Sequence, residues 1–118
     1  MLITVLKSKI MRARVTGNEL YYEGSLTLDP VLMEAAGMLP HEQVQVVNLN
    51  NGTRLTTYLI RGRERGNGEV ILNGPAARLG YAGDEIIILT YAQMDHDSAA
   101  SHLPVVVQVD ADNAPLEA

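Results

Sequence analysis

Residues 44–60 read VQVVNLNNGTRLTTYLI, and this stretch decides the fold class. Two runs rich in β-branched residues, Val44–Leu49 and Arg54–Ile60, flank the segment Asn50–Gly52. An Asn-Gly pair between such runs is the strongest short-range signal for a hairpin, because both residues accept the positive φ angles of a tight turn. The stretch therefore predicts two antiparallel strands joined by a turn.

Further short β-like runs dominate the sequence on either side of this hairpin. The predicted strands cover residues 3–6, 12–16, 20–22, 25–28, 70–72 and 85–91, with a turn at 16–18. A short helix is expected from Pro30, because Asp29 can cap its amides and Gly37 can end it in the left-handed conformation. Many short strands with one or two short helices favour a closed, mainly β barrel, since closure removes exposed sheet edges.

The last part of the chain lacks this periodicity. We expect a less ordered tail over residues 95–118, in which 102–109 forms an edge strand and the acidic end from residue 110 frays. With 118 residues, the chain has room for a single domain spanning 1–118.

The composition excludes several classes of function. The 9 Lys+Arg and 14 Asp+Glu give a net charge of −5, and 4% of residues are aromatic, so the chain lacks the basic field and stacking rings of a typical nucleic-acid-binding protein. It has no Cys, which excludes a disulfide scaffold, a thiolate nucleophile and a Cys-based metal site. No apolar run approaches membrane-spanning length, so we expect a cytoplasmic protein with no membrane partner.

Candidate chemistry is concentrated at Gly24-Ser25. The three histidines, His41, His96 and His102, lack the spacing of a metal site. We expect these histidines to lie at the surface, and we expect no metal to be bound.

Gly24 interrupts β-like sequence, which is typical of a β-bulge or a tight corner, here with the Ser25 hydroxyl exposed. The functional alternative is that Ser25 attacks the carbonyl of Gly24, which requires strained geometry and a donor for the developing oxyanion. The residues alone leave both interpretations open.

A set of short motifs makes the functional alternative specific. In chain order they are Lys9, Tyr22-Glu23-Gly24-Ser25, Asn51-Gly52-x-Arg54-x-Thr56-Thr57-Tyr58, Glu64-Arg65-Gly66, Asn73-Gly74-x-Ala76-Ala77 and Gly83-Asp84. In this order and spacing they resemble the signatures of the aspartate 1-decarboxylase family over residues 1–95. Each motif alone is weak, whereas the ordered set is specific.

The resemblance implies a pyruvoyl enzyme of pantothenate and coenzyme A biosynthesis that converts L-aspartate to β-alanine and CO2. Members of the family are made as inactive proenzymes and cleave themselves at a Gly-Ser bond, here Gly24–Ser25. The products are a β chain of residues 1–24 and an α chain of residues 25–118, on which Ser25 becomes the pyruvoyl group that forms a Schiff base with the substrate. Neither an external cofactor nor a metal is implied. The implied fold is a double-psi β-barrel.

The resemblance also assigns roles to matching positions. Tyr58 is the implied proton donor, and Thr57 stabilises the oxyanion during cleavage and borders the substrate. Lys9 and Arg54 are the implied cations for the substrate carboxylates, and the planar guanidinium of Arg54 suits bidentate capture. The other implied substrate-site residues are Asn73, Gly74, Pro75 and Ala76, with Tyr22 in support. The implied assembly is a homotetramer with active sites between subunits, and the need for an accessory maturation factor stays open.

Two positions depart from the family pattern. Met11 stands where His is common, and Pro75 stands where Ala is usual, which removes one backbone donor from the substrate loop. Taken singly, Lys9, Arg54 and Tyr58 are also compatible with ordinary surface or packing roles. The alternative function is therefore a non-catalytic small β-barrel that binds a partner through its hairpin edges and undergoes no cleavage.

Overall fold

A computed structural model of the chain describes residues 1–22 and 24–116. Glu23 of the Gly-Ser motif and the last two residues of the predicted tail lie outside this range. The elements are β1 (Leu2–Arg14), β2 (Gly17–Glu19), β3 (Ser25–Leu28), α1 (Pro30–Ala36), β4 (Gln43–Asn48), β5 (Arg54–Arg61), β6 (Val70–Asn73), the 3-10 helix η1 (Gly74–Arg78), β7 (Glu85–Asp95), α2 (His96–Ala99) and β8 (Val105–Gln108). None of the helices in the described residues has the length and apolar character to cross a membrane.

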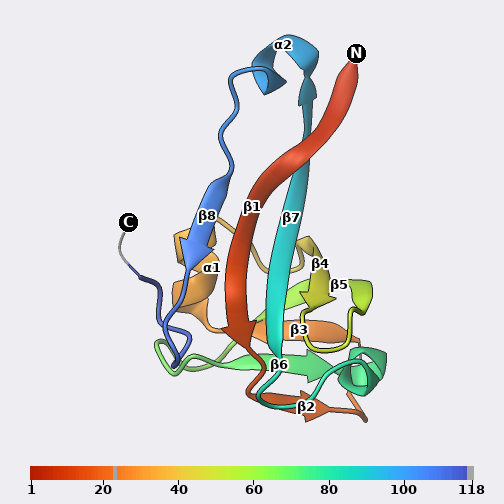
Figure 1. Ribbon diagram of the computed structural model, residues 1–118, viewed down its shortest axis with the longest axis vertical. Helices are drawn as coiled ribbons and strands as arrows, with labels where there is room; N and C mark the ends of the chain where they lie inside the picture. Colours follow the sequence, from red (N-terminus) through yellow and green to blue (C-terminus); the bar gives the residue numbers. More distant parts are fainter. Residues whose placement is uncertain (23, 117–118) are drawn as a thin grey trace.

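The strands form one sheet that closes on itself. Among the described residues, eight strands follow the order β2-β6-β3-β5-β4-β7-β1-β8 (Figure 1). β2 continues directly from β1, and between them the Thr16 N–H donates a 2.8 Å hydrogen bond to the carbonyl of Val70 at the start of β6. The β1–β2 segment is thus bonded to β7 on one side and β6 on the other, which closes a small barrel. The predicted mainly β barrel with short helices is confirmed.

The core fills the inside of this barrel with aliphatic side chains. On each strand every second residue points inward, as Val44 and Val46 do on β4 and Ile86 and Ile88 do on β7, all at most 1% exposed. The largest fully buried side chains are Ile10, Leu26, Leu28, Leu32, Leu59, Leu72, Ile86, Ile88, Val15, Val44, Val46 and Val70. The alternate residues therefore face outward, and this outer face carries most of the side chains of functional interest.

The helix predicted from Pro30 is confirmed. Its start is capped by the Asp29 carboxylate, which accepts a 2.9 Å hydrogen bond from Val31 N, and it ends at Gly37 with φ 69°. Asp29 also accepts from Gly66 N at 2.9 Å and Gly68 N at 2.8 Å. One carboxylate therefore fixes both the start of α1 and the loop between β5 and β6.

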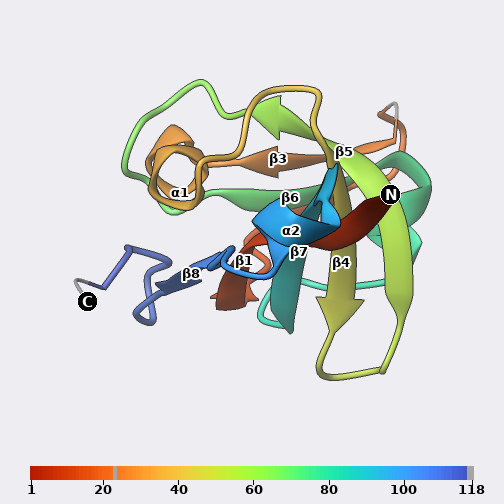
Figure 2. The same cartoon turned by 90° about the horizontal axis from the view of Figure 1, so that it is seen from above.

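β1 and β7 extend beyond the barrel as a long two-stranded arm (Figure 1). They pair antiparallel from Leu2↔Asp95 to Arg14↔Glu85, with α2 at the far end. The sequence predicted two separate strands at 3–6 and 12–16, but the structure joins them, and two register shifts let the strand bend into the barrel. Figure 2, seen from above the arm, shows β3, β4, β5 and β6 grouped around its base.

The tail is more regular than the sequence predicted. An edge strand expected within 102–109 is confirmed as β8, which runs parallel to β1 from Ser8↔Val105 to Met11↔Gln108. Asn113, 2% exposed, binds the acidic end to the barrel. Its side chain accepts from Arg14 N at 2.8 Å and donates to Arg14 O at 2.8 Å and Gly68 O at 2.9 Å.

Candidate active site

Ser25 and Asn73 form a buried polar pair at one edge of the barrel. They are direct partners in the antiparallel pair β3–β6, and their exposed fractions are 0% and 3%. Asn73 Nδ2 donates 2.8 Å hydrogen bonds to both Ser25 Oγ and Thr27 Oγ1. Both amide protons are thereby used, which fixes the plane of the amide and helps to hold Ser25 Oγ in place.

Gly74 packs directly against the backbone that precedes Ser25. Its φ is +64°, and a Cβ added there would lie 2.5 Å from Tyr22 O and 2.8 Å from Gly24 N. Only glycine therefore fits this position without moving the main chain. The start of η1 is pressed onto the segment that contains the predicted cleavage site.

A hollow of about 230 Å³ opens beside Gly24. Among the residues around it are three of the predicted site residues, Thr57, Pro75 and Ala76. Pro75 stands in the first turn of η1, where a backbone N–H has no partner within the helix. The departure from Ala to Pro therefore costs η1 no hydrogen bond. Thr57 and Gly24 line the same hollow. A hydroxyl in this position can donate a hydrogen bond to an oxyanion that forms on the Gly24 carbonyl.

Tyr58 lies beside Ser25 on the neighbouring strand. In the parallel pair β3–β5, Leu26 is aligned with Leu59, so the residues before them are also neighbours, about 4.8 Å apart between the strands. Tyr58 is half-buried. Consecutive residues of a strand point to opposite faces, so Tyr58 and Thr57 approach Gly24-Ser25 from different sides of the sheet.

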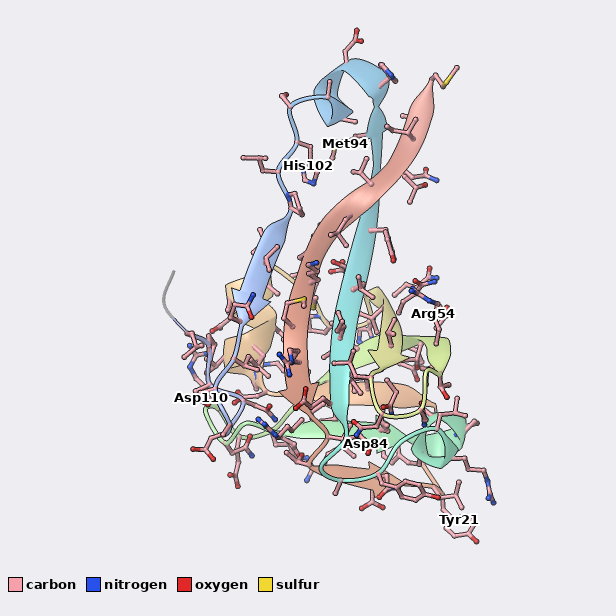
Figure 3. The ribbon with its side chains drawn as sticks, viewed as in Figure 1. Tyr21, Arg54, Asp84, Met94, His102 and Asp110 are labelled. Carbon is pink, nitrogen blue, oxygen red and sulfur yellow. The ribbon has the colours of Figure 1, made fainter. Side chains whose placement is uncertain are left out.

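The two cations predicted to bind carboxylates lie away from Ser25. Arg54 begins β5, four residues before Tyr58, which is about 13 Å along the strand. It is exposed, and Figure 3 shows its side chain projecting from the outside of the barrel. Lys9 is half-buried on β1, which pairs with β7 and β8, whereas β3 pairs with β5 and β6. One chain therefore does not bring all the predicted residues together.

Both cations nevertheless share the outer face of the sheet. Lys9 pairs with Leu89, and Leu89 pairs with Gln45 on β4, so these side chains point to the same side. Arg54 joins this row from β5, where its Nη1 donates a 2.8 Å hydrogen bond to Gln45 Oε1. The row is a strip outside the barrel with one positive charge at each end, Lys9 on β1 and Arg54 on β5.

The remaining predicted residues are peripheral. Tyr22 is 53% exposed and borders a second hollow of about 370 Å³. Met11 is half-buried on β1. His41 and His96 are exposed as predicted, but His102 is half-buried, because its Nε2 lies 2.8 Å from Leu6 O. The described residues contain no group of three His, Asp or Glu side chains that could hold a metal ion.

Two residues that contact this site belong to none of the motifs. One is Thr27, which accepts a hydrogen bond from the same Asn73 amide as Ser25. It could have been predicted only from its spacing, because residues two apart on a strand face the same side. Gln45 contacts Arg54 across the predicted hairpin. Its partner depends on the exact register of that hairpin, which the sequence leaves open.

Comparisons with known proteins agree on one enzyme family. The aspartate decarboxylase family model matches residues 1–116. The aspartate 1-decarboxylase of Leptospira biflexa is 58% identical over the whole length of both chains. That of Chloroherpeton thalassium is 56% identical over 98% of this chain and 84% of its own length, and that of Salinibacter ruber is 54% identical over 94% and 75%.

Proposed function

This chain belongs to the aspartate decarboxylase family, and we propose that it cleaves itself at Gly24–Ser25 and works through a pyruvoyl group made from Ser25. As a member of the family it is a carboxy-lyase that converts L-aspartate to β-alanine and CO2, the step that provides β-alanine for pantothenate. The observation that carries the proposal is the buried, hydrogen-bonded Ser25 next to Gly24, in a backbone segment clamped by Gly74.

Self-cleavage begins with Ser25 Oγ, which attacks the Gly24 carbonyl carbon. The hydroxyl proton is lost, the C–N bond breaks, and the Ser25 nitrogen leaves as an amine, so an ester replaces the amide. Thr57, beside Gly24, can donate to the oxyanion that forms in this step. Loss of the Ser25 α-proton then expels the Gly24 carboxylate and leaves dehydroalanine. Addition of water and loss of ammonia convert dehydroalanine to the pyruvoyl group.

The residues present suit such a group. Ser25 is fully buried at a strand end, where Asn73 holds its side chain, and the hollow beside Gly24 leaves room for a small amino acid. The pyruvoyl carbonyl supplies the electron sink that decarboxylation of an amino acid requires, without an external cofactor. Tyr58, on the neighbouring strand, is proposed to give a proton to the substrate α-carbon after CO2 leaves.

Substrate binding is proposed to use the cations Lys9 and Arg54 on the outer face, together with the residues at the start of η1. Arg54 and Lys9 bind the two carboxylates, because their charges are the ones that the motifs place on the outer face. Asn73, Gly74, Pro75 and Ala76 line the rest of the site, with Tyr22 in support. Arg54 begins β5 about 13 Å along the strand from Tyr58, and Lys9 lies on β1, so this spread favours a site that residues of a second copy complete.

We therefore propose a homotetramer with active sites between subunits. The strip formed by Lys9 and Arg54 of one subunit would meet the Ser25 edge of another. Light scattering of the mature protein should give a molar mass that corresponds to four copies of each chain. A monomer with full activity would contradict this assembly.

We also propose a cytoplasmic location, since a chain without Cys is compatible with a reducing compartment.

Mass spectrometry of the purified protein tests the cleavage. We expect chains of 24 and 94 residues, since 118 − 24 = 94, with the larger one lighter by one ammonia than a chain that starts with serine. Ser25→Ala should stay whole and inactive, whereas Ser98→Ala, at an exposed serine, should cleave normally. A single intact wild-type chain after prolonged warm incubation, alone and with cell extract, would overturn the proposal and leave the non-catalytic barrel.

A further inference from the structure

We propose that Gln45 and Tyr91 are positioning residues that hold Arg54 ready for the substrate carboxylate. Gln45 Oε1 accepts two hydrogen bonds, one of 2.8 Å from Arg54 Nη1 and one of 3.0 Å from the Tyr91 hydroxyl. The inference rests on the proposed substrate-binding role of Arg54. It adds two residues to that role that belong to none of the family motifs.

The strand register brings the three side chains together. Gln45 is paired with Thr56 on β5 and with Leu89 on β7. Arg54 and Tyr91 each lie two residues from these partners, so both are diagonal neighbours of Gln45 on the outer face. They approach Gln45 from opposite ends of β4, and their donors meet at one amide oxygen.

This arrangement limits the freedom of an exposed side chain. An arginine on a surface loses rotamer entropy when it binds a ligand, and a preformed hydrogen bond reduces that loss. Gln45 engages only Nη1, which leaves the other guanidinium donors for a carboxylate. Because a guanidinium can only donate, the Gln45 atom that faces Arg54 is the amide oxygen, and the Tyr91 hydroxyl donates to the same oxygen and helps to hold it there.

The hydrogen-bond partner of Arg54 is a neutral side chain. Several other cations of the barrel pair with carboxylates: Lys7 with Glu42, Arg12 with Glu85 and Arg65 with Glu34. In the described residues, Arg54 instead bonds a neutral amide. Its charge is therefore oriented but not cancelled, as a site for an anionic substrate requires.

Loss of this positioning should weaken substrate binding and spare the chemical step. Gln45→Met keeps the length of the side chain but removes the acceptor, and we expect KM for L-aspartate to rise about 10-fold with kcat within about twofold. Tyr91→Phe removes the second donor only, and we expect KM to rise about threefold. Gln93→Met and Tyr81→Phe, at exposed positions outside this contact, should leave KM unchanged.

Steady-state kinetics on fully cleaved protein, with Arg54→Ala in parallel, decides between the outcomes. If Gln45 acts through Arg54, Gln45→Met should add nothing to the KM of Arg54→Ala in the double variant. Independent, additive effects would overturn the inference, as would unchanged KM values for both Gln45→Met and Tyr91→Phe while Arg54→Ala raises KM. An Arg54→Ala variant with normal KM would overturn the proposed role of Arg54 itself and this inference with it.

Discussion

Asn73 Nδ2 donates a 2.8 Å hydrogen bond to Ser25 Oγ, although 48 positions separate the two residues in the chain. They meet because β3 and β6 pair antiparallel with Ser25 opposite Asn73. The same nitrogen also donates to Thr27 Oγ1, so the amide cannot rotate without losing two bonds. A residue of another strand therefore helps to hold the proposed nucleophile in place.

Replacement of Asn73 should slow maturation. Asn73→Ala removes both hydrogen bonds, and a serine that samples several rotamers spends less time aligned with the Gly24 carbonyl. We expect cleavage about 10-fold slower or more, measured as the loss of intact chain with time on a denaturing gel. Asn50→Ala, in the exposed turn between β4 and β5, is the matched control and should cleave at the wild-type rate. A wild-type rate in Asn73→Ala would contradict the orienting role.

A methyl group at Gly74 should also block cleavage. Gly74→Ala places a Cβ 2.5 Å from Tyr22 O and 2.8 Å from Gly24 N, so the segment before Ser25 must shift. Gly52→Ala is a close control, because its φ of +74° carries a similar strain of about 1 kcal/mol but nothing lies within 4 Å. We expect intact chain to accumulate in Gly74→Ala only, as measured by mass spectrometry. Equal cleavage of both variants would show that the close approach is unimportant.

Local signals explain which parts of the fold were predictable. The hairpin at 44–60 and the helix from Pro30 follow from turn and capping residues that act within a few positions. The sequence predicted a turn at 16–18 and a strand at 20–22, whereas the structure has the strand β2 at Gly17–Glu19 and turns or bends over 20–22. In the structure, Gly17 is extended through its pairing with Ile71 on β6, far along the chain. Such pairing overrides a local preference and has no local signal.

In the candidate site, too, the features carried by local motifs were predictable and those that depend on strand pairing were not. Gly24, Ser25 and Asn73 were predicted from motifs, and the structure brings them together. The separation of Arg54 from Ser25 was not predictable from the sequence in the same way, because it depends on which residue of β5 lies beside Ser25 when β3 and β5 pair. Gln45 was missed for a further reason: a glutamine in a hairpin carries no signal until the register is known.

The Asp29 carboxylate makes folding sensitive to acid. Burial raises its pKa, but the backbone N–H groups of Gly66, Val31 and Gly68, with the charge of Arg65, lower it more, so the net pKa lies below 3.8. A folded pKa below the unfolded one means that the carboxylate contributes its full stability above the unfolded pKa. That contribution is lost as the pH falls through the folded pKa.

Asp29→Asn should therefore cost stability in a pH-dependent way. At neutral pH we expect the free energy of unfolding to fall by about 1–3 kcal/mol. The side chain of Asp29→Asn would have an NH2 group where the Asp29 carboxylate has an acceptor oxygen, so a backbone N–H that Asp29 satisfies would face another donor. The difference from wild type should shrink as the pH falls below about 4. Urea unfolding followed by circular dichroism at several pH values measures this. Asp97→Asn, at an exposed residue, should show little difference throughout, and a pH-independent deficit in Asp29→Asn would contradict the assignment.

The C-terminal turn should be part of the folded unit through Asn113. Its side chain makes three hydrogen bonds to the backbone of Arg14 and Gly68, and its φ of +61° suits Asn better than Ala. Asn113→Ala leaves buried backbone groups unpaired, so we expect the free energy of unfolding to fall by about 2–4 kcal/mol in urea titrations. Asn67→Ala, which loses one local bond in an exposed loop, should cost less than about 1 kcal/mol. Equal stability of the two variants would mean that the acidic end contributes nothing to the barrel.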